Sequence, residues 1–210
     1  MATDTFATGS AIGLALGLGA WAAFAVARVR ALEGRRDVPW RALCGTGILA
    51  VCAPIVSADA YEALARGIVC IALLASAATD ARTGYLFDAV TFPAALSSAA
   101  VAVCAGATAN AAAGVLLLAG VSGSVFALSR GRWLGLGDVK ALYGLGAAFG
   151  PAEGALAVAA ACLCGLATTL IRRRHVPGAE IPFGPHLAAG AVLTLVFGHD
   201  ALRLAAESAI

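Results

Sequence analysis

The chain has 210 residues, of which 61% are hydrophobic and only 12% are charged, with a net charge of +2. Soluble globular domains carry about 25% charged residues. Together with a mean hydropathy of +0.91, this deficit excludes a soluble enzyme, a disordered chain and a nucleic-acid-binding protein. A membrane span takes about 20 residues, so the chain has room for about eight spans and no large extramembrane domain. We therefore expect an all-α, polytopic helical bundle in the lipid bilayer, whose chemistry is built from its spans and loops.

Apolar stretches separated by charges or turn residues predict eight spans in chain order. The first is expected to be a retained span rather than a signal peptide, because Asp4 precedes it and the first arginine, Arg28, follows it. The predicted spans are 9–27, 42–57, 63–79, 89–105, 110–129, 136–150, 153–171 and 183–198.

The distribution of basic residues predicts the orientation. With the N-terminus outside, all of the 14 basic residues except Arg66 and Arg203 fall in cytoplasmic loops or at cytoplasmic span ends. These 12 are Arg28, Arg30, Arg35, Arg36, Arg41, Arg82, Arg130, Arg132, Lys140, Arg172, Arg173 and Arg174. Cytoplasmic loops of membrane proteins are enriched in Lys and Arg, so the pattern favours eight spans over seven.

The cysteines do not form a metal or redox motif. All six lie inside apolar runs and none belongs to a C-x-x-C pair. They are Cys44, Cys52, Cys70, Cys104, Cys162 and Cys164. We expect them to pack as small apolar side chains, and we expect no metal and no cofactor.

Three acidic residues are expected at the cytoplasmic ends of spans. Asp80 ends the third span, Asp88 begins the fourth, and Asp138 begins the sixth within Gly135-Leu136-Gly137-Asp138. Acidic side chains at membrane depth are costly and therefore candidates for function. The other acids are expected in loops or tails: Asp4, Glu33, Asp37, Asp59, Glu62, Glu153, Asp200 and Glu207.

The predicted topology places Asp80 and Asp138 at similar depth on different spans. If these spans pack side by side, the two carboxyl groups can share a proton, so that one is ionised and the other neutral. Such a pair can hold and activate a water molecule for peptide hydrolysis. Gly135 and Gly137 would let a substrate strand pass close to Asp138. The alternative is that these acids are helix caps or interfacial anchors, since Asp is common at helix N-termini.

Three motifs in order resemble those of the type IV prepilin peptidases, a family of aspartic membrane proteases. DARTGYLFDAVTFP (80–93) is similar to the family's first signature, and LGLGDVKAL (134–142) is similar to its second, the GxGD motif. IPFGP (181–185) is similar to the opening of its last span. The matches extend over roughly residues 70–200. The resemblance implies a two-span region 1–62 with a cytoplasmic loop 28–41, a catalytic membrane domain 63–200 and a tail 201–210.

The resemblance also implies roles for individual residues. Asp80 and Asp138 would be the catalytic pair, and Asp88 a supporting acid. Gly135, Gly137, Lys140, Pro182 and Gly184 belong to the matched motifs, and Lys140 is expected to extend to lipid headgroups rather than to catalyse. The expected partner is a pilin-like precursor, cut where its basic leader meets its apolar segment, at the cytoplasmic face of the inner membrane.

Two features depart from the family pattern. Phe87 stands where the family usually has proline, which affects the expectation for Asp88 more than that for Asp80. The loop 28–41 lacks the cysteine-paired segment that larger members carry, so we expect a compact peptidase without the methyltransferase part. This size favours a Tad-type pilus over a type IV pilus or a secretion system; the sequence predicts no oligomeric state.

Other activities are open to the sequence. Gly120-Val121-Ser122-Gly123 matches the G-x-S-G of rhomboid serine proteases, with His186 as a distant partner, although the two residues are expected at different depths. A Ser–Lys hydrolase would need Lys140 beside a serine such as Ser129. A scaffold or transporter would use the acids as caps or as a proton path, and would tolerate their replacement by asparagine.

Overall fold

The computed structural model describes residues 22, 23, 25, 27, 29, 60–83, 86, 88–173 and 182–208. Five helices follow one another in this part of the chain: α3 (Ala60–Thr83), α4 (Asp88–Cys104), α5 (Thr108–Ser129), α6 (Leu136–Arg173) and α7 (Gly184–Ser208). The described residues contain no strand, so this part is all-helical as predicted. Four of the helices are long and apolar enough to cross a membrane, namely α3, α5, α6 and α7.

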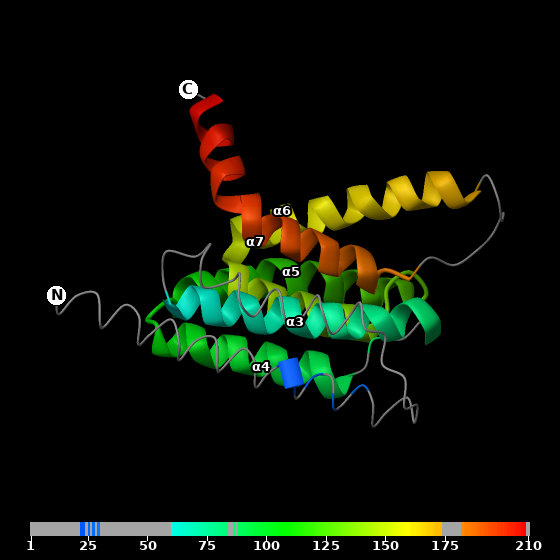
Figure 1. The fold of residues 1–210 in the computed structure, drawn as a ribbon, viewed down its shortest axis with the longest axis horizontal. Coiled ribbons are helices and arrows are strands. Elements are labelled where there is room, and N and C mark those ends of the chain that lie inside the picture. The colour runs from blue at the N-terminus through cyan, green and yellow to red at the C-terminus, as the bar shows by residue number, and fades with distance from the viewer. Residues whose placement is uncertain are drawn as a thin grey trace.

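Helix α6 is divided by a sharp kink at Gly150, where φ is 71°. Glycine adopts positive φ without a steric penalty, and Pro151 disfavours the helical conformation of the residue before it. The predicted spans 136–150 and 153–171 coincide with the two arms on either side of this kink, and the second arm turns away from the first (Figure 1). Most of the predicted span 9–27 and all of 42–57 lie outside the described residues, so the count of eight and the outside N-terminus stay predictions.

Close helix contacts rely on residues without bulky side chains. A Cβ atom on Gly114 of α5 would collide with the backbone of Gly146 and Gly150 in α6. A Cβ on Gly190 of α7 would collide with the Ala157 carbonyl in the second arm of α6. In membranes, small residues let helices approach closely enough for van der Waals packing to hold them together.

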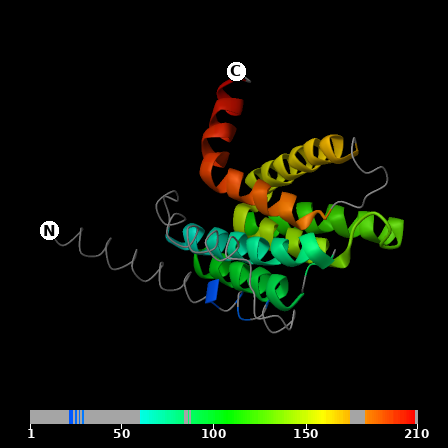
Figure 2. The ribbon, with the colours of Figure 1, turned by 45° about the vertical axis from the view of Figure 1, so that its right-hand side comes forward.

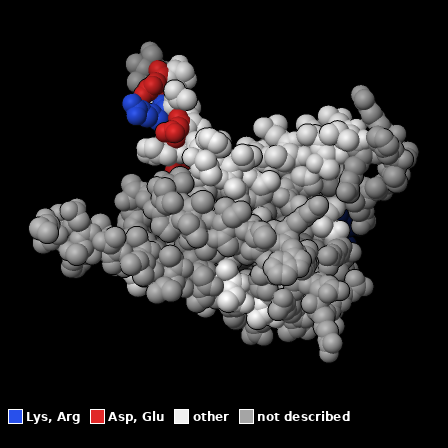
Figure 3. Space-filling model, viewed as in Figure 1, with Lys and Arg blue, Asp and Glu red and all other residues white. Residues whose placement is uncertain are grey.

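Apolar side chains form both the interior of the bundle and much of its described surface. Its largest fully buried side chains include Ile71, Leu73, Leu145 and Leu187, while leucines such as Leu116 and Leu128 on α5 are exposed. α3 and α4 lie side by side in both ribbon views, and the C-terminal end of α7 projects from the bundle (Figures 1 and 2). On the face shown in the space-filling view, most of the charged side chains that can be seen lie on that projecting end (Figure 3). An uncharged, apolar outer surface suits contact with lipid.

Four acids expected in loops or tails lie in helices instead, which corrects the sequence prediction. Glu62 is in the first turn of α3, Glu153 follows the kink of α6, and Asp200 and Glu207 are in α7. The residues expected to form a tail, 201–210, continue α7 as far as Ser208. Charges ended the apolar run at 198, but the residues that follow are mostly Ala, Leu, Arg and Glu, which favour helix.

Glu153 forms an ion pair that the sequence did not predict. The Arg66 Nη2 atom lies 2.7 Å from Glu153 Oε2, and both side chains are nearly buried. The same guanidinium group lies 3.4 Å from Glu62 and 5.3 Å from the ring centroid of Phe149. The pair therefore joins the first part of α3 to α6 next to the kink, far along α3 from Asp80.

Removing the acid of this pair is expected to destabilise the protein. Glu153→Gln leaves the arginine charge poorly compensated in a largely dry environment, and we expect a loss of about 3 kcal/mol in the free energy of unfolding. Unfolding of the purified chain in mixed micelles measures it. The matched control is Glu207→Gln, which breaks the exposed i,i+4 pair with Arg203 and should cost under about 0.5 kcal/mol. Equal losses for the two variants would contradict this prediction.

Candidate active site

Asp80 is buried near the end of α3 and is held by the start of α7. Only 3% of its surface is exposed, and its Oδ2 atom accepts a hydrogen bond of 2.7 Å from the backbone N–H of Gly184, the first residue of α7. The first N–H groups of a helix have no partner within the helix and attract negative charge. The helix start thus stabilises the carboxylate form of Asp80.

Asp138 lies in the first turn of α6. Its Oδ2 atom accepts a hydrogen bond of 3.2 Å from the N–H of Gly135, which caps the helix start. Its Oδ1 atom is shielded from solvent and has no hydrogen-bond partner among the described residues. Asp138 interacts electrostatically with Asp80. Two carboxyl groups from distant parts of the sequence are therefore near enough to affect each other electrostatically.

Three glycines from the matched motifs make close contacts around the two acids. A Cβ on Gly184 would lie 2.7 Å from Asp80 Oδ2, and one on Gly137 would lie 3.1 Å from the Leu86 carbonyl oxygen. A Cβ on Gly135 would lie 3.3 Å from Asp138 Oδ2. Gly135 and Gly137 were expected to leave space for a substrate strand. In the structure, the space beside them is occupied by Asp138 and Leu86 of the chain itself. The donation from Gly135 and Gly184 to the two acids was not predicted from the sequence.

Pro182 and His186 complete the turn that carries Gly184. The Pro182 carbonyl oxygen accepts a hydrogen bond of 2.9 Å from His186 Nδ1. The His186 N–H and the Leu187 N–H both bond the Phe183 carbonyl, at 3.0 Å each. These contacts fix the entry of the chain into α7 and thereby the direction of the Gly184 N–H.

Asp88 and Lys140 pair with each other. Lys140 Nζ lies 2.5 Å from Asp88 Oδ2 and joins the start of α6 to the start of α4. Lys140 was expected to extend to lipid headgroups, and this prediction was wrong. Its ammonium group pairs with Asp88 instead, because α4 places that carboxylate within reach. Phe87, which replaces the usual proline, lies outside the described residues.

Reversing one charge of this pair is expected to lower the free energy of unfolding, and reversing both charges is expected to restore it. Asp88→Lys or Lys140→Asp alone places like charges together, whereas the double variant re-forms the pair. Since the side chains are 59% and 30% exposed, we expect a coupling of about 0.5–1 kcal/mol in a double-mutant cycle of unfolding free energies. Additive effects would show that the two residues do not interact.

Among the described residues, neither serine candidate forms a hydrogen bond with a residue that could act as its general base. Ser122 Oγ donates to the Leu118 carbonyl of its own helix at 2.6 Å, while His186 bonds Pro182 and Thr168. Ser129 Oγ donates to Phe126 at 3.3 Å, and Lys140 is engaged by Asp88. A serine mechanism requires hydrogen-bond contact between nucleophile and base.

In the part of the chain that the structure describes, fold and site together define a helical membrane protein with two acids that affect each other electrostatically. Residues 67–170 match the model of the Type IV leader peptidase family. This central part of the chain, which holds both acids, belongs to that family.

Two curated relatives are the prepilin leader peptidase/N-methyltransferases of Burkholderia pseudomallei strains 1026b and K96243. Each is 37% identical over 164 residues, which cover 73% of this chain and 52% of the relative. The chain thus spans about half the length of these relatives. No solved structure matches it.

Proposed function

We propose that the protein is a membrane aspartic endopeptidase that removes the basic leader from type IV pilin-like precursors. The observation that carries the proposal is the approach of Asp80 and Asp138 within a segment of the Type IV leader peptidase family. In the bundle no other described pair of acids is held in this way, each by a backbone N–H from a motif glycine.

The chemistry follows from two carboxyl groups in different protonation states. The ionised group takes a proton from water, and the resulting hydroxide adds to the scissile carbonyl carbon. The protonated group gives its proton to the carbonyl oxygen. The tetrahedral intermediate then breaks the C–N bond, and a proton passes to the leaving nitrogen, which leaves a new carboxyl end and a new amine end. The reaction consumes one water and requires no metal or cofactor.

The site would work at the cytoplasmic boundary of the inner membrane. The positive residues of the loops favour a cytoplasmic position for this end of the bundle, which is where a basic leader would end and the apolar segment of a precursor would begin. The Asp88 side chain is 59% exposed, so a basic leader can reach it. To bind there, the leader has to compete with Lys140 for the carboxylate.

The test is cleavage of a co-expressed precursor, with mass spectrometry of the product. Each pilin-like precursor of the source genome is expressed with the wild-type chain, the Ser122→Ala variant or an empty vector. The proposal predicts one cut between leader and apolar segment of at least one precursor, with Ser122→Ala as active as wild type. Loss of the cut in Ser122→Ala would favour a serine mechanism, and failure to cut any precursor would contradict the proposed function.

A further inference from the structure

The turn between α5 and α6 is held in one shape by its own backbone. Arg130 and Gly131 adopt positive φ values of 52° and 75°, which end α5. Their N–H groups donate to the carbonyl oxygens of Ala127 and Phe126, at 3.2 and 2.9 Å respectively. The last carbonyl groups of a helix are often bonded by a nearby arginine side chain. Here the backbone supplies the donors, so the guanidinium group of Arg130 is not needed at the helix end.

The two arginines of this turn have no acidic partner in the part of the chain that the structure describes. Arg130 and Arg132 are both exposed, and neither side chain forms an ion pair or hydrogen bond with a described residue. The sequence contains no acidic residue between Asp88 and Asp138, and both of these acids already have partners within the chain. The turn therefore carries two uncompensated positive charges that are free to bind an anion.

Large apolar side chains accompany these charges. Trp133 is 82% exposed, and Leu128 in the last turn of α5 is 85% exposed. An indole ring has an apolar body and a polar N–H group, and tryptophan is enriched at the level of the lipid headgroups. Since α5 and α6 are both long and apolar enough to cross a membrane, the turn that joins them lies at a membrane surface.

This combination of charge, exposure and position favours one kind of ligand. Guanidinium groups bind phosphate oxygens through strong, charge-assisted hydrogen bonds, and positive residues near a membrane surface attract anionic lipids. Phosphatidylcholine carries the same phosphate, but its own ammonium group neutralises that charge. An anionic phospholipid leaves the phosphate charge available to the arginines and places its acyl chains beside the exposed apolar side chains.

We propose that residues 130–133 form a binding site for the phosphate group of an anionic phospholipid, with Trp133 lying among the headgroups beside it. The turn leads directly into the Gly135–Asp138 hydrogen bond that caps α6. A lipid bound at the turn would therefore fix the depth of Asp138 relative to the membrane surface. The proposal does not depend on the proposed peptidase function.

The test identifies the lipid beside Trp133 in the full chain. Trp21→Phe and Trp40→Phe remove the other two tryptophans, so that tryptophan emission comes from Trp133 alone. This chain is reconstituted in vesicles of equal parts phosphatidylglycerol and phosphatidylcholine, with bromine on the acyl chains of only one of the two lipids. Bromine quenches indole fluorescence at contact. The two preparations therefore compare the two lipids beside Trp133 at the same membrane charge.

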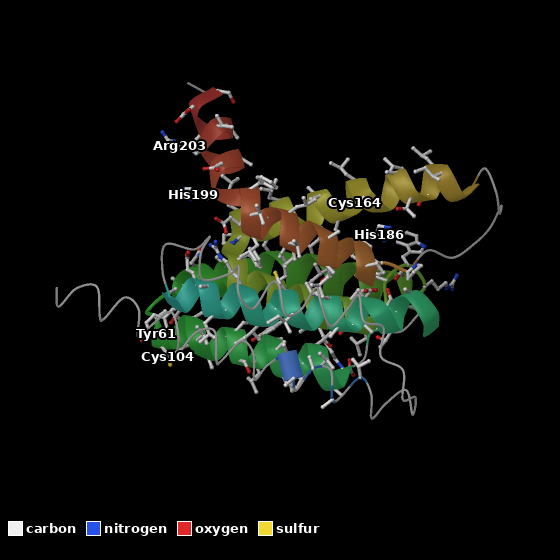
Figure 4. All side chains as sticks on the ribbon, in the orientation of Figure 1. Tyr61, Cys104, Cys164, His186, His199 and Arg203 are labelled. Atoms are coloured by element: carbon white, nitrogen blue, oxygen red, sulfur yellow. The ribbon has the colours of Figure 1, made fainter. Side chains whose placement is uncertain are left out.

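We expect brominated phosphatidylglycerol to quench Trp133 at least about twofold more than brominated phosphatidylcholine. In the double variant Arg130→Gln/Arg132→Gln the two lipids should quench equally. Arg130→Lys/Arg132→Lys keeps both charges and should retain most of the preference. The matched control is Arg203→Gln, which removes an exposed arginine from the projecting end of α7 (Figure 4) and should leave the preference unchanged.

Three results would overturn the proposal. The first is equal quenching by the two lipids, or a preference that survives in the double glutamine variant. The second is quenching by neither lipid, which would mean that protein, such as a second copy of the chain, covers Trp133. The third is loss of the preference in excess inorganic phosphate but not in chloride of the same ionic strength, which would assign the arginines to free phosphate. No activity is measured, so these outcomes are separate from those of the cleavage test.

Discussion

Asp80→Asn and Asp138→Asn are each expected to reduce the rate of leader cleavage by at least about 10²-fold, because a positioned acid or base contributes about 10²–10⁴-fold. Asparagine has the shape of the aspartate and can still accept from the backbone N–H of Gly184 or Gly135. It cannot accept a proton from water or return one to the carbonyl oxygen. The loss should therefore arise in kcat, with little change in the amount of folded protein.

The measurement is the initial rate with the purified variants in detergent, normalised to folded protein. Asp200→Asn is the matched control, since Asp200 is exposed on α7 away from the site, and it should cleave at the wild-type rate. A scaffold or transporter whose acids are caps would show no difference between the three variants. Cleavage by Asp80→Asn at the wild-type rate would show that Asp80 is not a member of the catalytic pair.

Gly184→Ala is expected to reduce kcat by about 10- to 100-fold although it changes no charge. The added methyl group would lie 2.7 Å from Asp80 Oδ2 and 3.1 Å from Asp80 Cβ and Cγ, so either the carboxylate or the start of α7 has to move. Displacement by about 1 Å of a catalytic group can cost about 10² in rate. The N–H of residue 184 would then also lose its direction toward the carboxylate.

Gly120→Ala provides the matched comparison for this steric effect. It makes the same chemical change on α5, where a Cβ meets nothing within 4 Å, so the rate should stay at the wild-type value. Membrane abundance and thermal unfolding of both variants distinguish a displaced carboxylate from a misfolded chain. Equal rates for the two variants would show that close contact between Gly184 and Asp80 does not matter for catalysis.

The helices could largely be predicted from the sequence, because a helix in a bilayer is marked by a long run of apolar residues. Runs of apolar residues ended by charges located α3, α4, α5, both arms of α6 and the first part of α7 to within a few residues. The break at Gly150-Pro151 is also local, since both residues act on their own backbone. The far end of α7 was missed because polar residues stop an apolar run without stopping a helix.

The contacts of the site could be predicted only in part. The motifs indicated that Asp80 and Asp138 belong together, but hydropathy contains no information about which backbone donor meets which carboxylate. The hydrogen bond from the Gly184 N–H to Asp80 joins residues 104 positions apart in the sequence. The ion pair between Arg66 and Glu153 likewise joins two different helices. Glu153 was assigned to a loop because a charge beside Gly and Pro looks like a turn, and only the packing of α3 against α6 identifies its partner.

The central claim is that Asp80 and Asp138 act as one unit on one water molecule. Its most direct test is the cleavage rate of the Asp80→Asn/Asp138→Asn double variant beside the two single variants, followed by mass spectrometry over long incubations. Residues that act as a unit are strongly non-additive, so the double variant should be no more than about threefold slower than either single variant. A double variant slower by the product of the two single effects, or a single variant within about threefold of wild type, would contradict the claim.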